Sequence, residues 1–263
     1  MSDTLLALLR DRCRNGAALA FSGGCDSALL LAVLARLRQE KAFPLLALHI
    51  QTPLQTAEEA ERCRKLADRF QVDLLTLSPD VLSLPAVCGN RRDRCYHCKK
   101  LIFTTLCATA KTHQIPLVMD GTNADDCREF RPGRQALAEL GIYSPLAEAG
   151  LTKMQVRKLA AEYGLEEAAL PASACLATRF PYDVSLTVQG LQRVSQAEKF
   201  LRSLVSGHLR VRVHGDLARI EVEKQNIQTV IAAAETISET FKKLGFSHTT
   251  IDLAGFRSGS FDA

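Results

Sequence analysis

Apolar residues in the first two thirds of the chain form short continuous runs that alternate with a longer helical pattern. The runs occupy residues 19–21, 43–50, 72–77 and 116–120, and residues 26–39 repeat apolar positions at helical spacing. A short continuous apolar run is typical of a strand buried on both faces of a parallel sheet. The pattern therefore predicts a doubly wound α/β fold, with strands and helices in alternation.

The pattern changes near the C-terminus, where apolar and polar residues alternate within short segments. Two such segments, 209–214 and 217–222, are separated by a Gly-Asp pair, and a third apolar segment lies at 249–253. A small polar pair between alternating segments is typical of a hairpin turn. We therefore predict two domains, an α/β domain over residues 1–183 and a smaller α+β domain over residues 184–263.

The first strand of the predicted hairpin carries arginines on one face. Alternation places Val211 and Val213 on the apolar face and Arg210 and Arg212 on the opposite face. Most polar faces of this kind are solvated. The alternatives are a site for a substrate phosphate and a contact between subunits, and the pattern alone leaves them open.

Composition and length are those of a globular protein. The chain has 263 residues, of which 47% are hydrophobic, enough to build one large or two modest cores. No apolar run approaches the roughly 20 residues that span a bilayer, and the N-terminus lacks the basic flank and apolar core of a secretory signal. We therefore expect a cytoplasmic protein with no membrane partner. We also expect a homo-oligomer.

The net charge and the number of cysteines argue against two further classes of protein, nucleic-acid-binding proteins and disulfide scaffolds. A net charge of +4 is compatible with anionic small molecules but too small to require RNA, so we expect no nucleic acid partner. Nine cysteines are few for a disulfide scaffold of this length, and Cys25 lies within a glycine-rich turn. Reduced thiols that bind a metal or take part in catalysis are the better interpretation.

The most informative motif is the Ser-Gly-Gly-Cys-Asp-Ser turn at residues 22–27, which joins an apolar run to a helical pattern. Glycines let the backbone approach a bound group closely, and the N–H groups at the following helix start attract an anion. The turn lacks both the Lys-Ser/Thr ending of a Walker loop and the three glycines of a dinucleotide fingerprint. Because ligands of such sheets bind at the carboxyl ends of the strands, the residues expected at the nucleotide site are Ser22, Gly23, Gly24, Asp26, Ser27, His49, Gly121, Asn123 and Asp125.

Carboxylates and arginines near this site have several possible roles. Asp26, Asp125 and Asp126 are candidates for holding Mg²⁺ or orienting a nucleotide, although aspartate also caps helices and bends turns. The arginines at 128, 131 and 134 could clamp pyrophosphate or a phosphorylated substrate, or form a solvated basic loop. The sequence does not decide between these alternatives.

Three cysteines lie in surroundings that favour chemistry over packing. Cys95 and Cys98 share one face of a predicted helix start among Arg, His and Lys residues, which lower thiol pKa values. Cys175 lies in an irregular segment that begins with a proline. The open alternatives are core thiols, disulfide exchange between Cys95 and Cys98, or three ligands of a zinc ion or a four-iron cluster with an open site.

Taken together, several segments resemble the LarE family of PP-loop ATP pyrophosphatases, whose nucleotide domain is adenine nucleotide alpha hydrolase-like. These segments are residues 22–27, 94–99, 120–126, 131–134, 171–179 and 210–221. The resemblance implies ATP-dependent adenylation of a pyridinium dicarboxylic acid mononucleotide, with Mg²⁺ as a cofactor and Asp26 among the catalytic residues. Attack by enzyme-held sulfur then releases a thiocarboxylate and AMP, for the nickel-pincer nucleotide cofactor of lactate racemase.

The resemblance also implies where the sulfur comes from. In one route of the family, the cysteine matching Cys175 gives up its own sulfur and becomes dehydroalanine. In the other, cysteines matching Cys95, Cys98 and Cys175 hold a [4Fe-4S] cluster that carries an extra sulfide from a sulfide donor. This chain has all three cysteines, which favours the cluster route, and Arg210 and Arg212 resemble positions that contact the substrate phosphate.

Three other functions compete with this prediction. A tRNA thiolation enzyme of the same superfamily would need a basic RNA surface, against which the small net charge counts. An amide-forming ligase of the NAD or GMP synthetase type has no need for the three cysteines. A non-catalytic iron-sulfur or zinc carrier would keep the loop only as a relic.

Overall fold

A computed structural model describes residues 3–127, 132–170 and 174–257 of the chain. The chain divides into two compact units, and neither is continuous in sequence. The first takes in Met1–Thr52, Ala57–Val81 and Cys95–Ala172, and the second takes in Pro53–Thr56, Leu82–Arg94 and Ser173–Ala263. A domain boundary at residue 183 remains a prediction.

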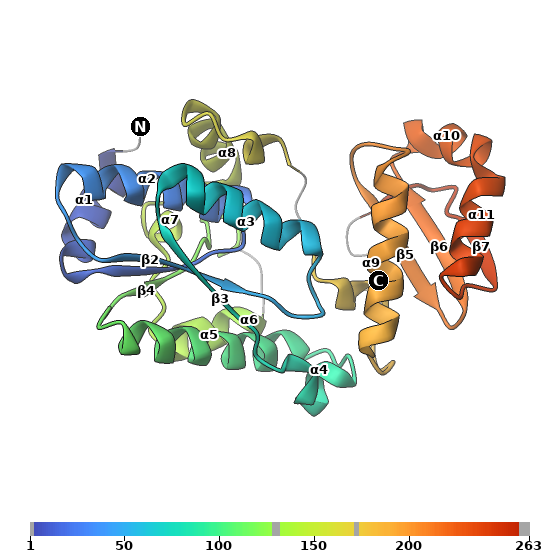
Figure 1. The fold of residues 1–263 in the computed structure, drawn as a ribbon, viewed down its shortest axis with the longest axis horizontal. Coiled ribbons are helices and arrows are strands. Elements are labelled where there is room, and N and C mark those ends of the chain that lie inside the picture. The colour runs from blue at the N-terminus through green and yellow to red at the C-terminus, as the bar shows by residue number, and fades with distance from the viewer. Residues whose placement is uncertain (1–2, 128–131, 171–173, 258–263) are drawn as a thin grey trace. The chain divides into compact units, whose positions relative to one another are not determined.

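The first unit is built on a parallel four-stranded sheet in the order β3-β2-β1-β4 (Figure 1). Its strands are β1 (Ala17–Ala20), β2 (Leu45–Ile50), β3 (Asp73–Leu77) and β4 (Val118–Met119). Its helices are α1 (Asp3–Arg12), α2 (Cys25–Glu40), α3 (Ala57–Phe70), α5 (Arg94–Thr112), α6 (Pro132–Glu139), α7 (Pro145–Glu148) and α8 (Lys153–Glu162). The predicted parallel α/β sheet is confirmed, although β4 is shorter than the expected strand at 116–120.

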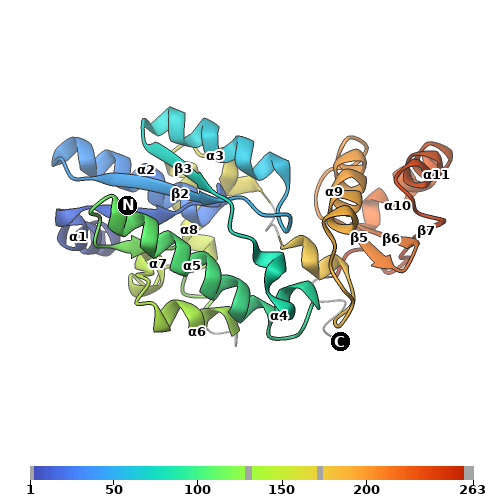
Figure 2. The ribbon, with the colours of Figure 1, turned by 60° about the horizontal axis from the view of Figure 1, so that its bottom comes forward.

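Helices cover both faces of this sheet, as Figures 1 and 2 show. Leu19 of β1 packs into a core with α1, α2, α3, α7 and α8, whereas its neighbour Ala18 packs into a second core with α5 and α6. Because side chains alternate between faces along a strand, each strand needs apolar residues at successive positions. Of the helices in the described ranges, none combines the length and apolarity needed to cross a membrane.

The second unit holds a mixed three-stranded sheet in the order β5-β6-β7. Its strands are β5 (Leu209–His214), β6 (Leu217–Val222) and β7 (His248–Ile251), and its helices are α4 (Pro85–Cys88), α9 (Val188–Arg202), α10 (Ile227–Ala232) and α11 (Ala234–Lys243). β5 and β6 pair antiparallel around Gly215, which has a φ of 66°, and β7 adds in parallel to β6. The predicted hairpin and α+β character are therefore confirmed.

The arginine face of β5 is buried, although most polar faces of this kind are solvated. Arg210 is 8% exposed and Arg212 is 4% exposed. The Arg212 guanidinium donates to a carboxylate oxygen of Glu221 and to the carbonyl of Thr178 in the 3₁₀ turn η4 (Leu176–Arg179). The alternation of residues correctly predicted that Arg210 and Arg212 share a face of β5. The burial of that face depends on the segments that pack against it, such as η4.

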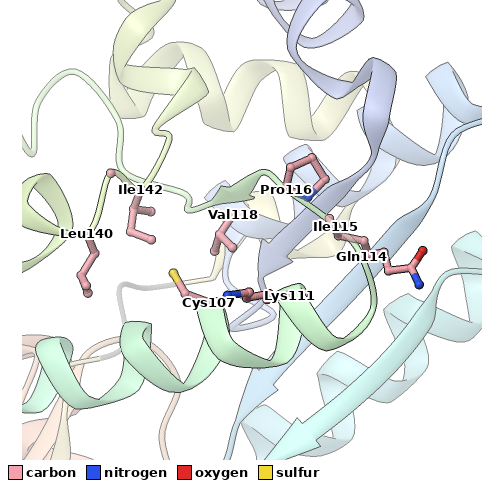
Figure 3. Close-up of a pocket in the computed structure, with 9 residues that line it drawn as sticks. Cys107, Lys111, Gln114, Ile115, Pro116, Val118, Leu140 and Ile142 are labelled. Carbon is pink, nitrogen blue, oxygen red and sulfur yellow. The ribbon is translucent and has the colours of Figure 1, made fainter.

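A cavity of about 400 Å³ opens beside β4 in the first unit (Figure 3). Cys107 and Lys111 of α5 line it together with Val118 at the beginning of β4 and Leu140 and Ile142 beyond α6. Because Val118 begins β4, the cavity lies at the amino end of that strand. The candidate nucleotide site lies at the opposite edge of the sheet, at the carboxyl ends of the strands.

Candidate functional site

The glycine-rich turn closes on itself at the beginning of α2. Gly23 has a φ of 66°, and Gly24 is the N-cap residue of α2 in an extended conformation. The Ser22 and Ser27 hydroxyl oxygens lie 3.2 Å apart, and the Ser27 hydroxyl donates to the carbonyl of Gly24 at 3.1 Å. The turn thus joins the carboxyl end of β1 to a helix N-terminus, an arrangement that suits an anion.

Helix α3 lies directly behind this turn. The Arg62 Nε donates to the Gly23 carbonyl at 2.8 Å, and a Cβ on Gly23 would come within 3.0 Å of the Cys63 Sγ. The positive φ and this close contact both favour glycine at position 23. Sequence reasoning did not select Arg62, because nothing local marks a residue whose partner lies 39 positions earlier.

His49 lies at the end of β2 and is 1% exposed. Its Nδ1 is 3.0 Å from the Phe21 carbonyl and 3.4 Å from the Cys63 Sγ. In this structure the imidazole therefore supports the segment that enters the turn. Contact between His49 and a nucleotide remains a prediction.

Asp26 lies in a network of charged and amide side chains. Its carboxylate pairs with the Lys153 ammonium and accepts from the Asn123 Nδ2 at 3.2 Å. The Lys153 backbone N–H donates to Asp125 at 2.8 Å, and the Asp125 N–H donates to the Asn123 Oδ1 at 3.0 Å. The network brings together three residues that the sequence predicted at the site and adds Lys153, which it missed.

A signal for the position of Lys153 was present in the sequence. Thr152 and Gln155 form a capping box, which fixes the beginning of α8 at Lys153. Asp125 accepts from the first N–H of this helix. It therefore caps the helix, which is one of the roles that the sequence left open for it. A capping box locates a helix start but says nothing of the ion pair with Asp26, 127 residues away.

Gly121 lets the chain after β4 approach the beginning of α2. A Cβ at this position would lie 3.2 Å from the Asp26 Cβ and 3.2 Å from the Ser27 nitrogen. The preceding Asp120 is buried and accepts from the Ser144 hydroxyl at 2.6 Å. The predicted Gly121 segment therefore packs against the glycine-rich turn, as expected for neighbouring carboxyl ends of parallel strands.

The two thiols of the C-x-x-C motif lie in the first turns of α5. Cys95 is exposed and Cys98 is partly exposed, so neither is a dry core thiol. The Tyr96 hydroxyl and the Lys100 ammonium both donate to Glu139 of α6, which ties these turns to the rest of the unit. In each unit by itself, the described residues contain no group of three His, Cys, Asp or Glu side chains placed to hold a metal.

Cys175 belongs to the second unit, where it is exposed and precedes η4. The Arg179 Nη1 donates to the carbonyls of Ala174 and Cys175, at 3.1 and 3.4 Å. The opposite edge of the same guanidinium forms two bonds of 2.7 and 3.0 Å with the Glu198 carboxylate, which also accepts from the Val211 N–H of β5. One buried ion pair therefore joins the cysteine loop to the arginine-bearing strand.

Several arginines gather around this ion pair. Glu198 and Glu221 are the two buried acids of the cluster, and its arginines are Arg179, Arg202, Arg210, Arg212 and Arg219. Burial, together with the neighbouring Arg179, lowers the pKa of Arg210 to about 10, so the group remains a cation at neutral pH. A cluster of arginines is a suitable environment for a phosphate.

The remaining candidates divide between the core and the surface. Cys13 and Cys63 pack in the core, and burial raises the pKa of each thiol to about 12. Cys25 is 5% exposed and packs beneath the turn. Arg134 donates to the carbonyl of Cys127, whereas residues 128 and 131 lie outside the described residues.

Comparison with known proteins gives the family. Residues 1–91 match a family described as a PP-loop domain. The chain is 36% identical to pyridinium-3,5-bisthiocarboxylic acid mononucleotide synthase of Lactiplantibacillus plantarum, over 97% of this chain and 91% of that protein. Uncharacterized proteins of Synechocystis sp. (36% identity, 94% of this chain and 91% of the relative) and Methanocaldococcus jannaschii (32%, 91% and 90%) are also similar. The chain therefore belongs to the LarE family of PP-loop ATP-dependent sulfur transferases.

Proposed function

We propose that this enzyme adenylates a carboxylate of a pyridinium-3,5-dicarboxylic acid mononucleotide and converts it to a thiocarboxylate, a precursor of the nickel-pincer nucleotide cofactor. A full-length relative whose name states the bisthiocarboxylic product supports this substrate. We expect the reaction to take place in the cytoplasm, where thiols stay reduced. A sulfide donor is then the second partner.

The first step activates the carboxylate at the glycine-rich turn. A carboxylate oxygen of the substrate attacks the α-phosphorus of ATP, and pyrophosphate leaves with the electron pair of the broken P–O bond. The N–H groups at the beginning of α2 and the Lys153 ammonium would neutralise phosphate charge, and Asp26 is the carboxylate that would hold Mg²⁺. Sulfur then adds to the acyl carbon, and AMP leaves with the carboxylate oxygen.

The observation that carries the proposal is the buried Arg179–Glu198 pair of the second unit. It holds the carbonyl of Cys175 on one side and the N–H of Val211 on the other. A residue that can deliver sulfur and arginines that can bind a nucleotide phosphate, Arg210 and Arg212, therefore belong to one compact unit. Such an arrangement aligns sulfur and substrate before reaction, which lowers the entropic barrier.

Three thiols provide a donor set of the kind that binds a [4Fe-4S] cluster. Cys95 and Cys98 lie one helical turn apart with solvent access, and the exposed Cys175 is the third thiol. We propose that these three hold the cluster in the active enzyme. Bound there, it would supply an activated sulfide, while the arginines of the second unit would hold the substrate phosphate.

Anaerobic purification followed by iron and acid-labile sulfide analysis tests the sulfur source. We expect about four irons per chain in the wild type and loss of the iron in Cys95→Ala, Cys98→Ala and Cys175→Ala. Cys127→Ala is the matched control, because it removes another exposed thiol. Iron-free protein that thiolates its substrate once, and becomes lighter by the mass of hydrogen sulfide, would instead make Cys175 the sacrificial donor.

The sulfur transfer itself is tested by mass spectrometry of the substrate. Wild-type enzyme with ATP and a sulfide source should exchange a carboxylate oxygen for sulfur and release AMP and pyrophosphate. Release of AMP without any sulfur in the product would contradict the proposed function.

A further inference from the structure

The peptide group between Gly23 and Gly24 can adopt either of two orientations, so another part of the chain must hold it in one of them. Glycine occupies positive and negative φ with similar ease, so a Gly-Gly peptide can flip at little cost. In a planar trans peptide the C=O and N–H bonds point in opposite directions. Whatever holds the Gly23 carbonyl therefore also sets the direction of the Gly24 N–H.

Arg62 holds that carbonyl in this structure. Its Nε donates to the Gly23 oxygen at 2.8 Å from helix α3. The Gly24 N–H accordingly points away from α3, toward the Ser22 hydroxyl, from which it lies 3.4 Å. A bond of that length is weak, so this N–H can exchange the hydroxyl for a stronger acceptor.

Close packing between α3 and the turn restrains the hydrogen bond from Arg62 to the Gly23 carbonyl. The Gly23 Cα lies so close to Cys63, the next residue of α3, that a Cβ would be 3.0 Å from the thiol sulfur. Helix and turn therefore cannot shift much relative to each other. A guanidinium N–H donates in a fixed plane, and its charge strengthens the bond.

We propose that Arg62 is a positioning residue that fixes the Gly23–Gly24 peptide so that the Gly24 N–H stays directed at the pyrophosphate group of ATP. The inference rests on the proposed binding of ATP at this turn. Arg62 acts through the backbone, so its loss weakens binding of ATP and pyrophosphate without removing any group that takes part in the reaction.

The sequence offers a direct spectroscopic readout of this peptide. Gly23-Gly24 is the one Gly-Gly pair in the chain, so protein labelled with carbonyl-¹³C, ¹⁵N-glycine gives a single carbonyl-correlated amide signal, that of Gly24. Titration with inorganic pyrophosphate or ATP should shift this signal in the full-length wild-type protein. A wild-type signal that responds to neither ligand would contradict ATP binding at the turn, and with it the proposed function.

Three variants test the role of Arg62. In Arg62→Ala we expect the Gly24 signal to move or broaden before any ligand is added, and the dissociation constant for pyrophosphate to rise about tenfold or more. Arg64→Ala is the matched control, because it removes an exposed arginine of the same helix and should behave as wild type. Unchanged melting temperatures show that neither variant has unfolded.

The third variant separates hydrogen bonding from charge. Arg62→Gln removes the positive charge but keeps an N–H donor at the position of the arginine Nε, so we expect it to recover part of the affinity that Arg62→Ala loses. A loss of affinity in Arg62→Gln equal to that in Arg62→Ala would mean that charge alone matters and would overturn the proposal. A Gly24 signal and pyrophosphate affinity in Arg62→Ala equal to those of wild type would overturn it as well.

Discussion

At the scale of single residues, charged side chains in the two units act under very different solvation. Lys153 is 33% exposed where it pairs with Asp26, whereas Arg179 and Glu198 are 2% and 1% exposed. A partly exposed pair contributes little to stability because water and salt screen it, and breaking a buried pair leaves an uncompensated charge. The first pair should therefore matter for activity and the second for folding.

Replacing Lys153 should reduce activity without unfolding the protein. We expect Lys153→Ala to lower kcat/KM for ATP about tenfold or more, since a positive charge beside Asp26 is lost at the proposed phosphate site. Its free energy of unfolding should change by less than about 1 kcal/mol. Pyrophosphate release and urea unfolding measure the two effects, and Lys158→Ala, an exposed lysine of α8, is the control. Equal activity of the two variants would contradict a role for Lys153.

Replacing Glu198, unlike replacing Lys153, should greatly lower the free energy of unfolding. Glu198→Ala leaves Arg179 buried without a counter-charge, so we expect destabilisation of about 3–5 kcal/mol. Because the chain has no tryptophan, urea unfolding is best followed by circular dichroism. Arg202→Ala removes only the exposed partner of Glu198 and should cost less than about 1 kcal/mol. The double variant Arg179→Leu, Glu198→Leu should regain much of the stability, and failure to do so would assign the loss to Glu198 alone.

At the scale of elements, the glycine-rich turn depends on the helix behind it. The strand before the turn and the helix after it were predictable, because apolar runs and helical spacing are local properties of the sequence. The support from α3 was not predictable, since Arg62 lies 39 residues after its partner Gly23 and Cys63 lies 42 residues after its partner Phe21. Periodicity indicates which face of α3 is buried but not what the face contacts.

Gly23 and Gly150 offer a matched test of this support. Both have φ values near 66°, but a Cβ at Gly150 meets nothing within 4 Å, whereas one at Gly23 meets the Cys63 sulfur at 3.0 Å. Gly150→Ala should cost about 1–2 kcal/mol from backbone strain alone, and Gly23→Ala should cost more and abolish pyrophosphate binding. In the double variant Gly23→Ala, Cys63→Ala, the part of this cost that comes from the contact with the Cys63 sulfur should be relieved, and the part that comes from backbone strain should remain. Urea unfolding and calorimetric titration measure these effects, and equal costs at both glycines would contradict the close contact.

At the scale of the whole molecule, the nine cysteines divide into three buried, three partly buried and three exposed thiols. Cys13, Cys25 and Cys63 are buried, and burial raises the pKa of each. Cys95, Cys127 and Cys175 are exposed. Polar and basic neighbours in the sequence predicted the accessibility of Cys95, and the irregular segment around Cys175 predicted that of Cys175.

The buried thiols should make the protein less stable in alkali. The pKa values of Cys13 and Cys63 rise from 9.0 to about 12 on folding, so above pH 9 the folded chain binds more protons than the unfolded chain. Stability is then fully present below pH 9 and falls by about 1.4 kcal/mol per pH unit for each thiol until about pH 12. Urea unfolding between pH 8 and about pH 11, under reducing conditions, should show a shallower decline in Cys63→Ala than in wild type. Cys127→Ala should keep the wild-type slope, and identical slopes in all three proteins would contradict the prediction.

The sequence by itself determined the parallel sheet, the hairpin, and the turn at residues 22–27, because apolar spacing and glycine conformation act over a few neighbouring residues. It also brought Asp26, Asn123 and Asp125 to one edge, since the carboxyl ends of parallel strands meet there. Only the tertiary structure decided that Lys153 pairs with Asp26, that Arg62 holds the turn, and that the arginine face of β5 is buried against η4. Desolvation and ion pairing depend on which distant segments pack together, and no local pattern in the chain carries that information.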